Sequence, residues 1–202
     1  QVGGKWVSLY HHGAFSSTDP DECLRRINDR LTKATGELRT LDLLVITWGT
    51  AWVYRYTREN IVVSNCHKIP SQEFERSRLS VEDIVKEYLV LIGRLREINP
   101  GLRILFTVSP IRHWKDGAHG NQLSKATLLL AIDRLREELQ HVYYFPAYEI
   151  VLDELRDYRF YADDMLHMSG FTVDYIWERF LYSFISPEVL GLMNQIGRVN
   201  KG

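Results

Sequence analysis

LDLLVIT, residues 41–47, is a short and almost uninterrupted apolar run, and it decides the fold class of this 202-residue chain. A strand with one solvated face alternates apolar and polar residues, whereas a continuous apolar run is typical of a parallel strand covered on both faces. Two further runs of this kind follow, RILFTV at residues 103–108 and VYYF at residues 142–145. Together the three runs predict a parallel β-sheet.

Helical patterns occupy the chain between and after these runs. Pro20 suits the first turn of one helix. Ser80 and Asp83 form a capping-box pattern at the start of another, which Pro100 should end. The expected helices cover residues 20–38, 80–99, 123–139 and 148–155, with a closing helix from near Ser169. Strands that alternate with helices predict one α/β domain in which helices sandwich a parallel sheet.

Composition limits the classes of function. Apolar residues make up 45% of the chain and charged residues 25%, which is ordinary for a globular protein of one domain. A net charge of -1, with basic residues dispersed among acidic ones, argues against nucleic-acid binding. Cys23 and Cys66 are far apart, which indicates neither a disulfide framework nor a zinc ribbon. No apolar run approaches the roughly 20 residues that span a bilayer.

Polar stretches follow each predicted strand. TWGTAWVY (47–54) comes after the first strand, SPIRHWKDG (109–117) after the second, and DDMLH (163–167) lies beyond the third. In parallel sheets the carboxyl ends of the strands meet at the same edge, where ligands bind. We therefore expect the three stretches to lie at one edge of the sheet.

Asp164 and His167 stand three residues apart at the entrance to the last predicted helix, where both side chains can lie on one side of a turn. His167 can then act as a general base and Asp164 can orient its ring, provided that a hydroxyl nucleophile lies within about 3 Å. Taken alone, the pattern is more typical of a capping aspartate and a solvated histidine. Asp163 cannot be told apart from Asp164 on this pattern.

Several motifs in a fixed order make the interpretation more specific. They are TWGTAWVY (47–54), NCHKIP (65–70), SPIRHWKDG (109–117), NQLSKATLL (121–129), YFPAYEI (144–150) and DELRDYRFYADDMLH (153–167). Together they closely resemble the GSCFA family, a branch of the SGNH or GDSL-like hydrolases. The resemblance runs from about Trp6 to beyond Phe180.

The resemblance implies a flavodoxin-like three-layer α/β/α hydrolase that removes acyl groups from a small, carbohydrate-like substrate, without a metal or organic cofactor. It assigns His167 as the catalytic base and Asp164 as the residue that orients it. It further implies that Gly49 and Asn65 hold the oxyanion, where preorganised donors contribute roughly 3 to 4 kcal/mol each. The G-x-N-D form of the oxyanion loop found in SGNH enzymes does not occur here.

Residues in or near the same stretches are the expected substrate contacts: His67, His113, Arg112 and Trp48. For Arg112, a solvated loop charge is the common alternative. The tryptophans and tyrosines of this region can pack in the core instead of stacking on a sugar. A metal site made of His113, Asp116 and His119 with Asp163 matches no zinc spacing, so we expect no metal.

The family's nucleophile motif is the main departure, since no GSC or GDS sequence occurs in residues 1–202. We expect an N-terminally incomplete domain, with the serine motif and its strand upstream of Gln1 and with no activity of its own. The alternative is a natural variant that lost its nucleophile and serves as a carbohydrate-binding or scaffold protein. Both the cytoplasm and the bacterial envelope stay open as compartments, and so does the oligomeric state.

A sheet that lacks this strand should have a gap at its middle, with a free edge on each side. We expect the stretch at residues 6–10 or a partner chain to fill that gap, or else an unfilled gap with visible structural compensation. A continuous sheet made of the three predicted strands alone would contradict this expectation.

Overall fold

The parallel sheet consists of three strands in the continuous order β1-β5-β6. The computed structural model describes residues 1–199. β1 (Leu43–Trp48) pairs in parallel with β5 (Arg103–Val108), and β5 pairs in parallel with β6 (Val142–Tyr144). The three strands therefore end at the same edge, as the apolar runs predicted.

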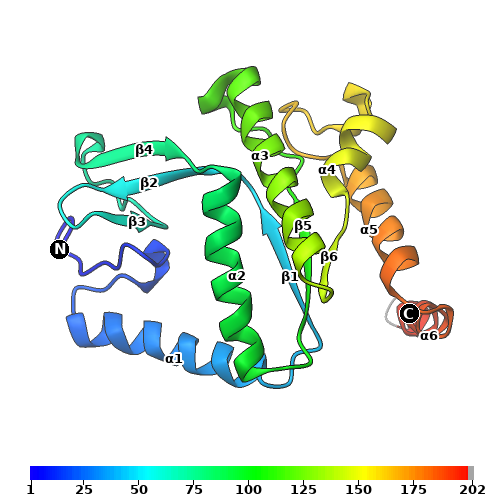
Figure 1. Cartoon of the computed structure of the whole chain (residues 1–202), viewed down its shortest axis with the longest axis horizontal. Helices are drawn as coiled ribbons and strands as arrows, with labels where there is room; N and C mark the ends of the chain where they lie inside the picture. The colour runs from blue at the N-terminus through cyan, green and yellow to red at the C-terminus, as the bar shows by residue number, and fades with distance from the viewer. Residues whose placement is uncertain (200–202) are drawn as a thin grey trace.

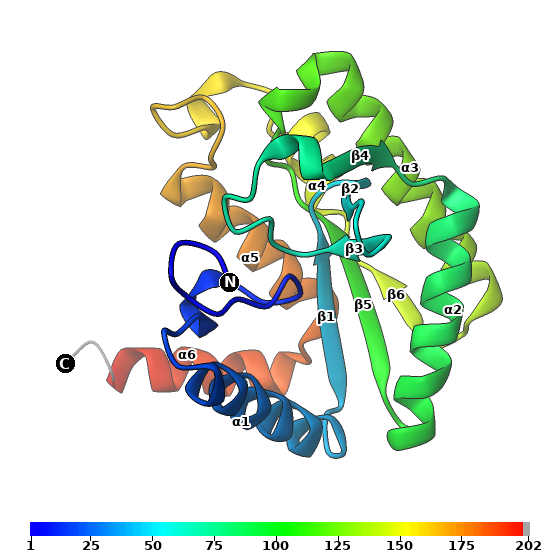
Figure 2. The ribbon, with the colours of Figure 1, turned by 90° about the vertical axis from the view of Figure 1, so that its left-hand side faces the viewer.

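Helices lie on both faces of this sheet (Figures 1 and 2). They are α1 (Pro20–Leu38), α2 (Val81–Ile98), α3 (Gly117–Glu138), α4 (Ala147–Glu149), α5 (Gly170–Phe184) and α6 (Pro187–Val199). Side chains of α2 and α3 pack on one face of the sheet, and side chains of α5 pack on the other. The arrangement agrees with the three-layer α/β/α fold expected from the sequence.

Burial along β5 explains why the layers form. Ile104, Phe106 and Val108 are fully buried in the cluster that includes α2 and α3. Leu105 is equally buried, but it belongs to the cluster that includes α5. Because successive side chains of a strand point to opposite faces, a strand covered on both faces needs apolar residues throughout.

Local signals start the helices where the sequence predicted, with one exception. The Ser80 hydroxyl accepts a hydrogen bond from the Asp83 N–H, and the Asp83 carboxylate accepts one from the Ser80 N–H, which completes the capping box. α3 begins at Gly117, earlier than the predicted start at residue 123. Asn121 and Ser124 are buried in its first turns, and these tertiary contacts offset the low helix propensity of the glycines.

The sheet has no gap at its middle, so that expectation is wrong. β1, β5 and β6 are direct neighbours, and residues 6–10 join none of them. Trp6 instead forms an isolated antiparallel bridge with Ser17. Within residues 1–199 the unpaired strand edge next to β1 lies at the flank of the sheet rather than inside it.

A second sheet, which was not predicted, follows the end of β1. β2 (Trp52–Tyr56), β3 (Ile61–Val63) and β4 (Phe74–Arg78) pair antiparallel in the order β3-β2-β4. Figure 1 shows this sheet to one side of the three layers, near the N-terminal segment. Its strands are short. β2 (WVYRY) is rich in strand-forming residues, but β4 (FERSR) is mostly polar and carries little strand signal.

The described part of the chain ends in two helices, of which only the first was predicted. The hydroxyl of Ser169 accepts a hydrogen bond from the Thr172 N–H and caps α5. α6 then leads away from the layers (Figure 1). Among the helices of the described part, none is long and apolar enough to cross a membrane.

Candidate functional site

Asp164 and His167 form a hydrogen-bonded turn at the entrance to α5. The His167 Nδ1 and Asp164 Oδ2 atoms are 2.5 Å apart, while Asp164 Oδ1 accepts from the N–H groups of Leu166 and His167, both at 2.9 Å. The hydrogen bond with the His167 ring, followed by these two N–H donors, lowers the pKa of Asp164 to about 2. The carboxylate therefore stays ionised near neutral pH, as a group that orients an imidazole must.

The same loop closes on itself through backbone hydrogen bonds. The Ala162 N–H donates to the His167 carbonyl at 2.8 Å, and the Met165 N–H donates to the Ala162 carbonyl at 2.9 Å. The side chains of His167 and Asp164 remain 62% and 48% exposed, so a substrate can reach the imidazole. Within the described part of the chain Asp163 makes no side-chain hydrogen bond or ion pair, which distinguishes it from Asp164.

The loop after β1 is held by buried side chains of α3. The Ser124 hydroxyl accepts a hydrogen bond from the Ala51 N–H at 2.8 Å and contacts the Thr50 hydroxyl at 3.0 Å. The Lys125 ammonium donates to the Gly49 carbonyl at 2.6 Å. Among residues 1–199 the N–H groups of Gly49 and Thr50 have no acceptor. Two adjacent free N–H groups on a fixed loop can bind an oxyanion.

Asn65 and His67 belong to a loop that is bonded to the N-terminal segment. The Asn65 side-chain oxygen accepts from the His67 N–H at 2.9 Å, and the Asn65 N–H donates to the Leu9 carbonyl at 3.0 Å. The His67 Nε2 atom lies 2.7 Å from the Ser8 carbonyl oxygen. In these contacts both side chains shape the loop. No hydrogen bond within residues 1–199 joins Asn65 to Gly49, so their shared role toward an oxyanion stays a prediction.

His113 and Arg112, which follow β5, connect the other two loops. The His113 Nε2 atom lies 3.7 Å from the position that a Cβ on Gly49 would occupy, so the imidazole packs beside this glycine. The guanidinium of Arg112 lies 5.8 Å from the ring centroid of Tyr161, in the loop that carries the Asp164–His167 pair. The three loops thus lie at one edge of the sheet, as expected.

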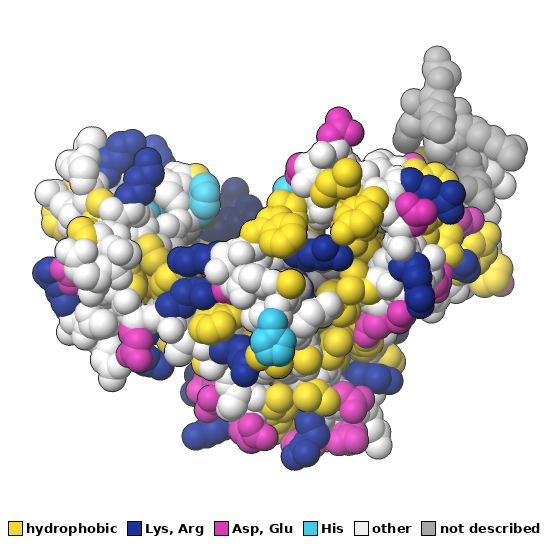
Figure 3. Space-filling view, turned by 90° about the horizontal axis from the view of Figure 1, so that it is seen from above, with side chains coloured by type: hydrophobic (Ala, Val, Ile, Leu, Met, Phe, Trp, Pro, Cys, Tyr) yellow, Lys and Arg dark blue, Asp and Glu magenta, His cyan; other side chains and the backbone are white. Residues whose placement is uncertain are grey.

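Arg112 lines two small cavities. One has a volume of about 200 Å³ and lies beside the first turns of α3: Arg112, His113, Trp114, Gly117, Ala118, Asn121 and Gln122 line it. The other has a volume of about 190 Å³: Arg112, Val151, Leu152, Arg156, Asp157, Tyr158 and Tyr161 line it. Figure 3 views the molecule from this end and shows basic and hydrophobic side chains gathered across the middle of the face.

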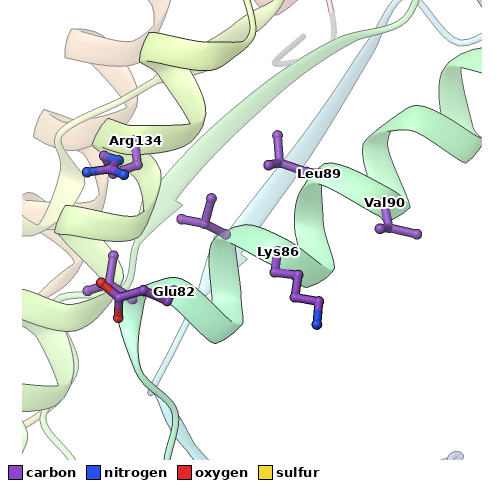
Figure 4. A pocket seen from close by; sticks show the side chains of 7 residues that line it. Glu82, Lys86, Leu89, Val90 and Arg134 are labelled. Carbon is purple, nitrogen blue, oxygen red and sulfur yellow. The ribbon is translucent and has the colours of Figure 1, made fainter.

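A larger groove of about 400 Å³ lies between α2 and α3 (Figure 4). Glu82 and Lys86 of α2 and Arg134 of α3 surround aliphatic side chains there. None of the candidate site residues lines this groove, so we give it no part in the site.

Trp48 lies in the core. It is only 8% exposed, its indole N–H donates to the Tyr88 hydroxyl at 2.8 Å, and its ring centroid lies 4.7 Å from those of Tyr88 and Phe106. A side chain enclosed in this way cannot stack on a sugar, so we withdraw Trp48 as a substrate contact.

Asp116, considered above for a metal site, forms a buried ion pair with Arg76 of β4. Its side chain is 1% exposed, and the Arg76 guanidinium also lies 4.2 Å from the Trp52 ring centroid. The pair links the second sheet to the turn before α3, a structural role that the sequence did not indicate.

Ser124 and Lys125 were also missed as site residues. Both lie on the buried face of α3 with Leu128 and Ala131. Polar residues at apolar helix positions are the signal that could have identified them.

The sequence model of the GSCFA family matches residues 1–180. The match includes both sheets and the loops that carry Gly49, Asp164 and His167. A comparison with curated proteins finds no match.

Proposed function

The chain belongs to the GSCFA family, and on that basis we propose that it supplies the catalytic base and the oxyanion donors of an SGNH-type serine ester hydrolase. The Asp164–His167 pair carries the proposal. An ionised carboxylate on Nδ1 leaves Nε2 of an exposed imidazole free to take a proton.

The proposed reaction is acyl transfer to a serine and then to water. His167 takes the proton of the serine hydroxyl as its oxygen attacks the ester carbonyl, and returns that proton to the departing alcohol. A water molecule, deprotonated by His167 in the same way, releases the acid and restores the serine. We propose that the nucleophile is the serine of the family's GSCFA motif. That motif does not occur in residues 1–202.

Negative charge develops on the carbonyl oxygen during both attacks. The free N–H groups of Gly49 and Thr50 are the donors that we assign to it, and the resemblance adds the side chain of Asn65. His113 packs beside Gly49, and Arg112 lines both adjoining cavities. We propose that these two residues, with His67, contact an acylated carbohydrate-like substrate.

A matched pair of variants tests the proposal in the protein expressed from its complete coding sequence. Asp164→Asn keeps an oxygen for the two backbone N–H groups, but the amide NH2 group in place of Oδ2 cannot accept a hydrogen bond from Nδ1 of His167. We expect kcat for acetyl-ester hydrolysis to fall by about 10³- to 10⁴-fold. Asp163→Asn removes the neighbouring charge and should retain near wild-type rates.

Equal rates for both variants would contradict the proposal. Absence of hydrolysis in the wild type, together with binding of acylated sugars, would instead favour a carbohydrate-binding or scaffold protein on the same fold.

A further inference from the structure

Lys125 is a cation enclosed in the protein at the edge that carries the site. The residue is 1% exposed, and its ammonium donates to the carbonyls of Gly49 and Ser109, both at 2.6 Å. These residues directly follow the adjacent strands β1 and β5. Enclosing an ammonium group in this way is costly unless its hydrogen bonds compensate, which raises the question of what the charge does there.

The bonded carbonyl belongs to the peptide unit that joins Gly49 to Thr50. A charged donor on the carbonyl oxygen draws electrons through this unit and makes its N–H, which is that of Thr50, a stronger donor. This N–H is one of the two that lack an acceptor within residues 1–199. The ammonium thus acts on one side of the peptide while the free N–H lies on the other.

We propose that Lys125 is a positioning residue that orients and polarises the Gly49–Thr50 peptide, so that the Thr50 N–H binds the developing oxyanion more strongly. The proposal rests on the proposed function for its catalytic part. The effect on the peptide itself depends only on the contacts of Lys125.

A purely structural role would need no charge. Ser124, the residue before Lys125, already holds the same loop through the Ala51 N–H and the Thr50 hydroxyl with a neutral side chain. Besides its two hydrogen bonds to loop carbonyls, the cation adds an electric field that a neutral side chain would not provide.

The charge can also be switched off by pH. Burial lowers the pKa of Lys125 from 10.5 to about 8. His113, in the loop after β5, packs its Nε2 beside Gly49. The test therefore includes a variant that removes this imidazole.

Carbon-detected NMR of the Gly49 carbonyl, from about pH 6 to about pH 10, tests the contact without substrate or activity. We expect the Gly49 and Ser109 carbonyl shifts to titrate together near pH 8. The change should persist in His113→Gln and be absent in Lys125→Met. Because the wild type alone provides the titration, a Lys125→Met protein that does not fold leaves the test intact. Carbonyl shifts that do not change in the wild type would overturn the assignment.

Hydrolysis then tests the catalytic part. Lys125→Met should lower kcat about tenfold to hundredfold with KM changed less than about threefold, and Lys125→Arg should recover part of the loss. Wild-type kcat should fall above about pH 8 as the ammonium loses its proton. Ser124→Ala should keep this alkaline decline, whereas Lys125→Met should lose it.

The two experiments fail in different ways. A wild type that hydrolyses no ester overturns the proposed function, while the carbonyl titration still decides what Lys125 does to the peptide. An alkaline decline that persists in Lys125→Met overturns the catalytic part alone.

Discussion

The two parts of the candidate site are held in opposite ways. The Gly49 loop is held by direct hydrogen bonds from residues far away in the sequence, the buried Ser124 and Lys125 on α3. The loop with Asp164 and His167 is exposed and is closed by hydrogen bonds among its own residues. The first arrangement depends on the whole fold, whereas the second needs only a few residues.

This difference matches the different requirements of oxyanion donors and of a catalytic base. Oxyanion donors must keep their position while charge develops. The buried contacts of Ser124 and Lys125 with the Gly49 loop, called the brace below, keep them there. A base that takes and returns a proton has to meet substrate and solvent, which an exposed turn permits. Substitutions in the turn should therefore change activity alone, whereas substitutions at the brace should also lower the free energy of unfolding.

The largest expected effect is on activity, in the exposed turn. His167→Ala should lower kcat/KM for ester hydrolysis by about 10³-fold or more, roughly 4 kcal/mol, because no base remains. Since the side chain is 62% exposed, the free energy of unfolding should change by less than about 0.5 kcal/mol. Parallel assays and urea titrations measure both. A large loss of stability would contradict the expectation that the exposed turn affects activity alone.

The next effect concerns stability, at the buried ion pair beside the brace. Arg76→Met leaves the carboxylate of Asp116 buried without its partner, which should cost about 3 kcal/mol in urea unfolding. Arg78→Met, on the exposed end of the same strand, is the matched control and should cost less than about 0.5 kcal/mol. Similar losses for both would show that the pair contributes nothing specific.

A smaller loss is expected at the brace itself. Ser124→Ala removes the acceptor of the Ala51 N–H and should lower the free energy of unfolding by about 1 to 2 kcal/mol. Thr127→Ala, which removes a hydroxyl bonded to a carbonyl of its own helix, should cost less. If the two variants are equally stable, the contact with the loop is not a brace.

The smallest effect is a change in the pKa of one group in the exposed turn. Asp164 should titrate near pH 2, so its carboxylate is ionised above that pH. The small stabilisation from this exposed turn is complete above the ordinary pKa of 3.8 and is lost as pH falls from there through about 2. In His167→Ala the pKa should rise part of the way toward 3.8, because two backbone donors remain. Carbon NMR of the carboxyl group measures this. An unchanged pKa would mean that, in solution, the His167 imidazole does not form a hydrogen bond with the Asp164 carboxylate.

The sequence predicted the features whose signals are local. The apolar run at residues 103–108 indicated a strand covered on both faces, and Ser80 with Asp83 indicated a helix start. Both are present. The second sheet was missed because β4 has a polar sequence and depends on its pairing with β2.

The residues of the candidate site likewise fall into those that local spacing indicates and those that only tertiary contacts bring together. The resemblance pointed to Asp164 and His167, and these two side chains are in contact because they lie three residues apart at one turn. Lys125 could not be assigned, because its partners lie 76 and 16 residues away and meet it only in the folded chain. The burial of Trp48 likewise depends on packing against Tyr88, which no local pattern shows.

The central claim is that His167, held by Asp164, activates a serine. A fluorophosphonate reacts with an activated serine, and mass spectrometry of the labelled peptide identifies the residue. In the protein from the complete coding sequence we predict labelling of one serine, with strong loss of labelling in His167→Ala and Asp164→Asn but not in Asp163→Asn. Equal labelling of the wild type and His167→Ala, or none in a folded wild type, would contradict the claim.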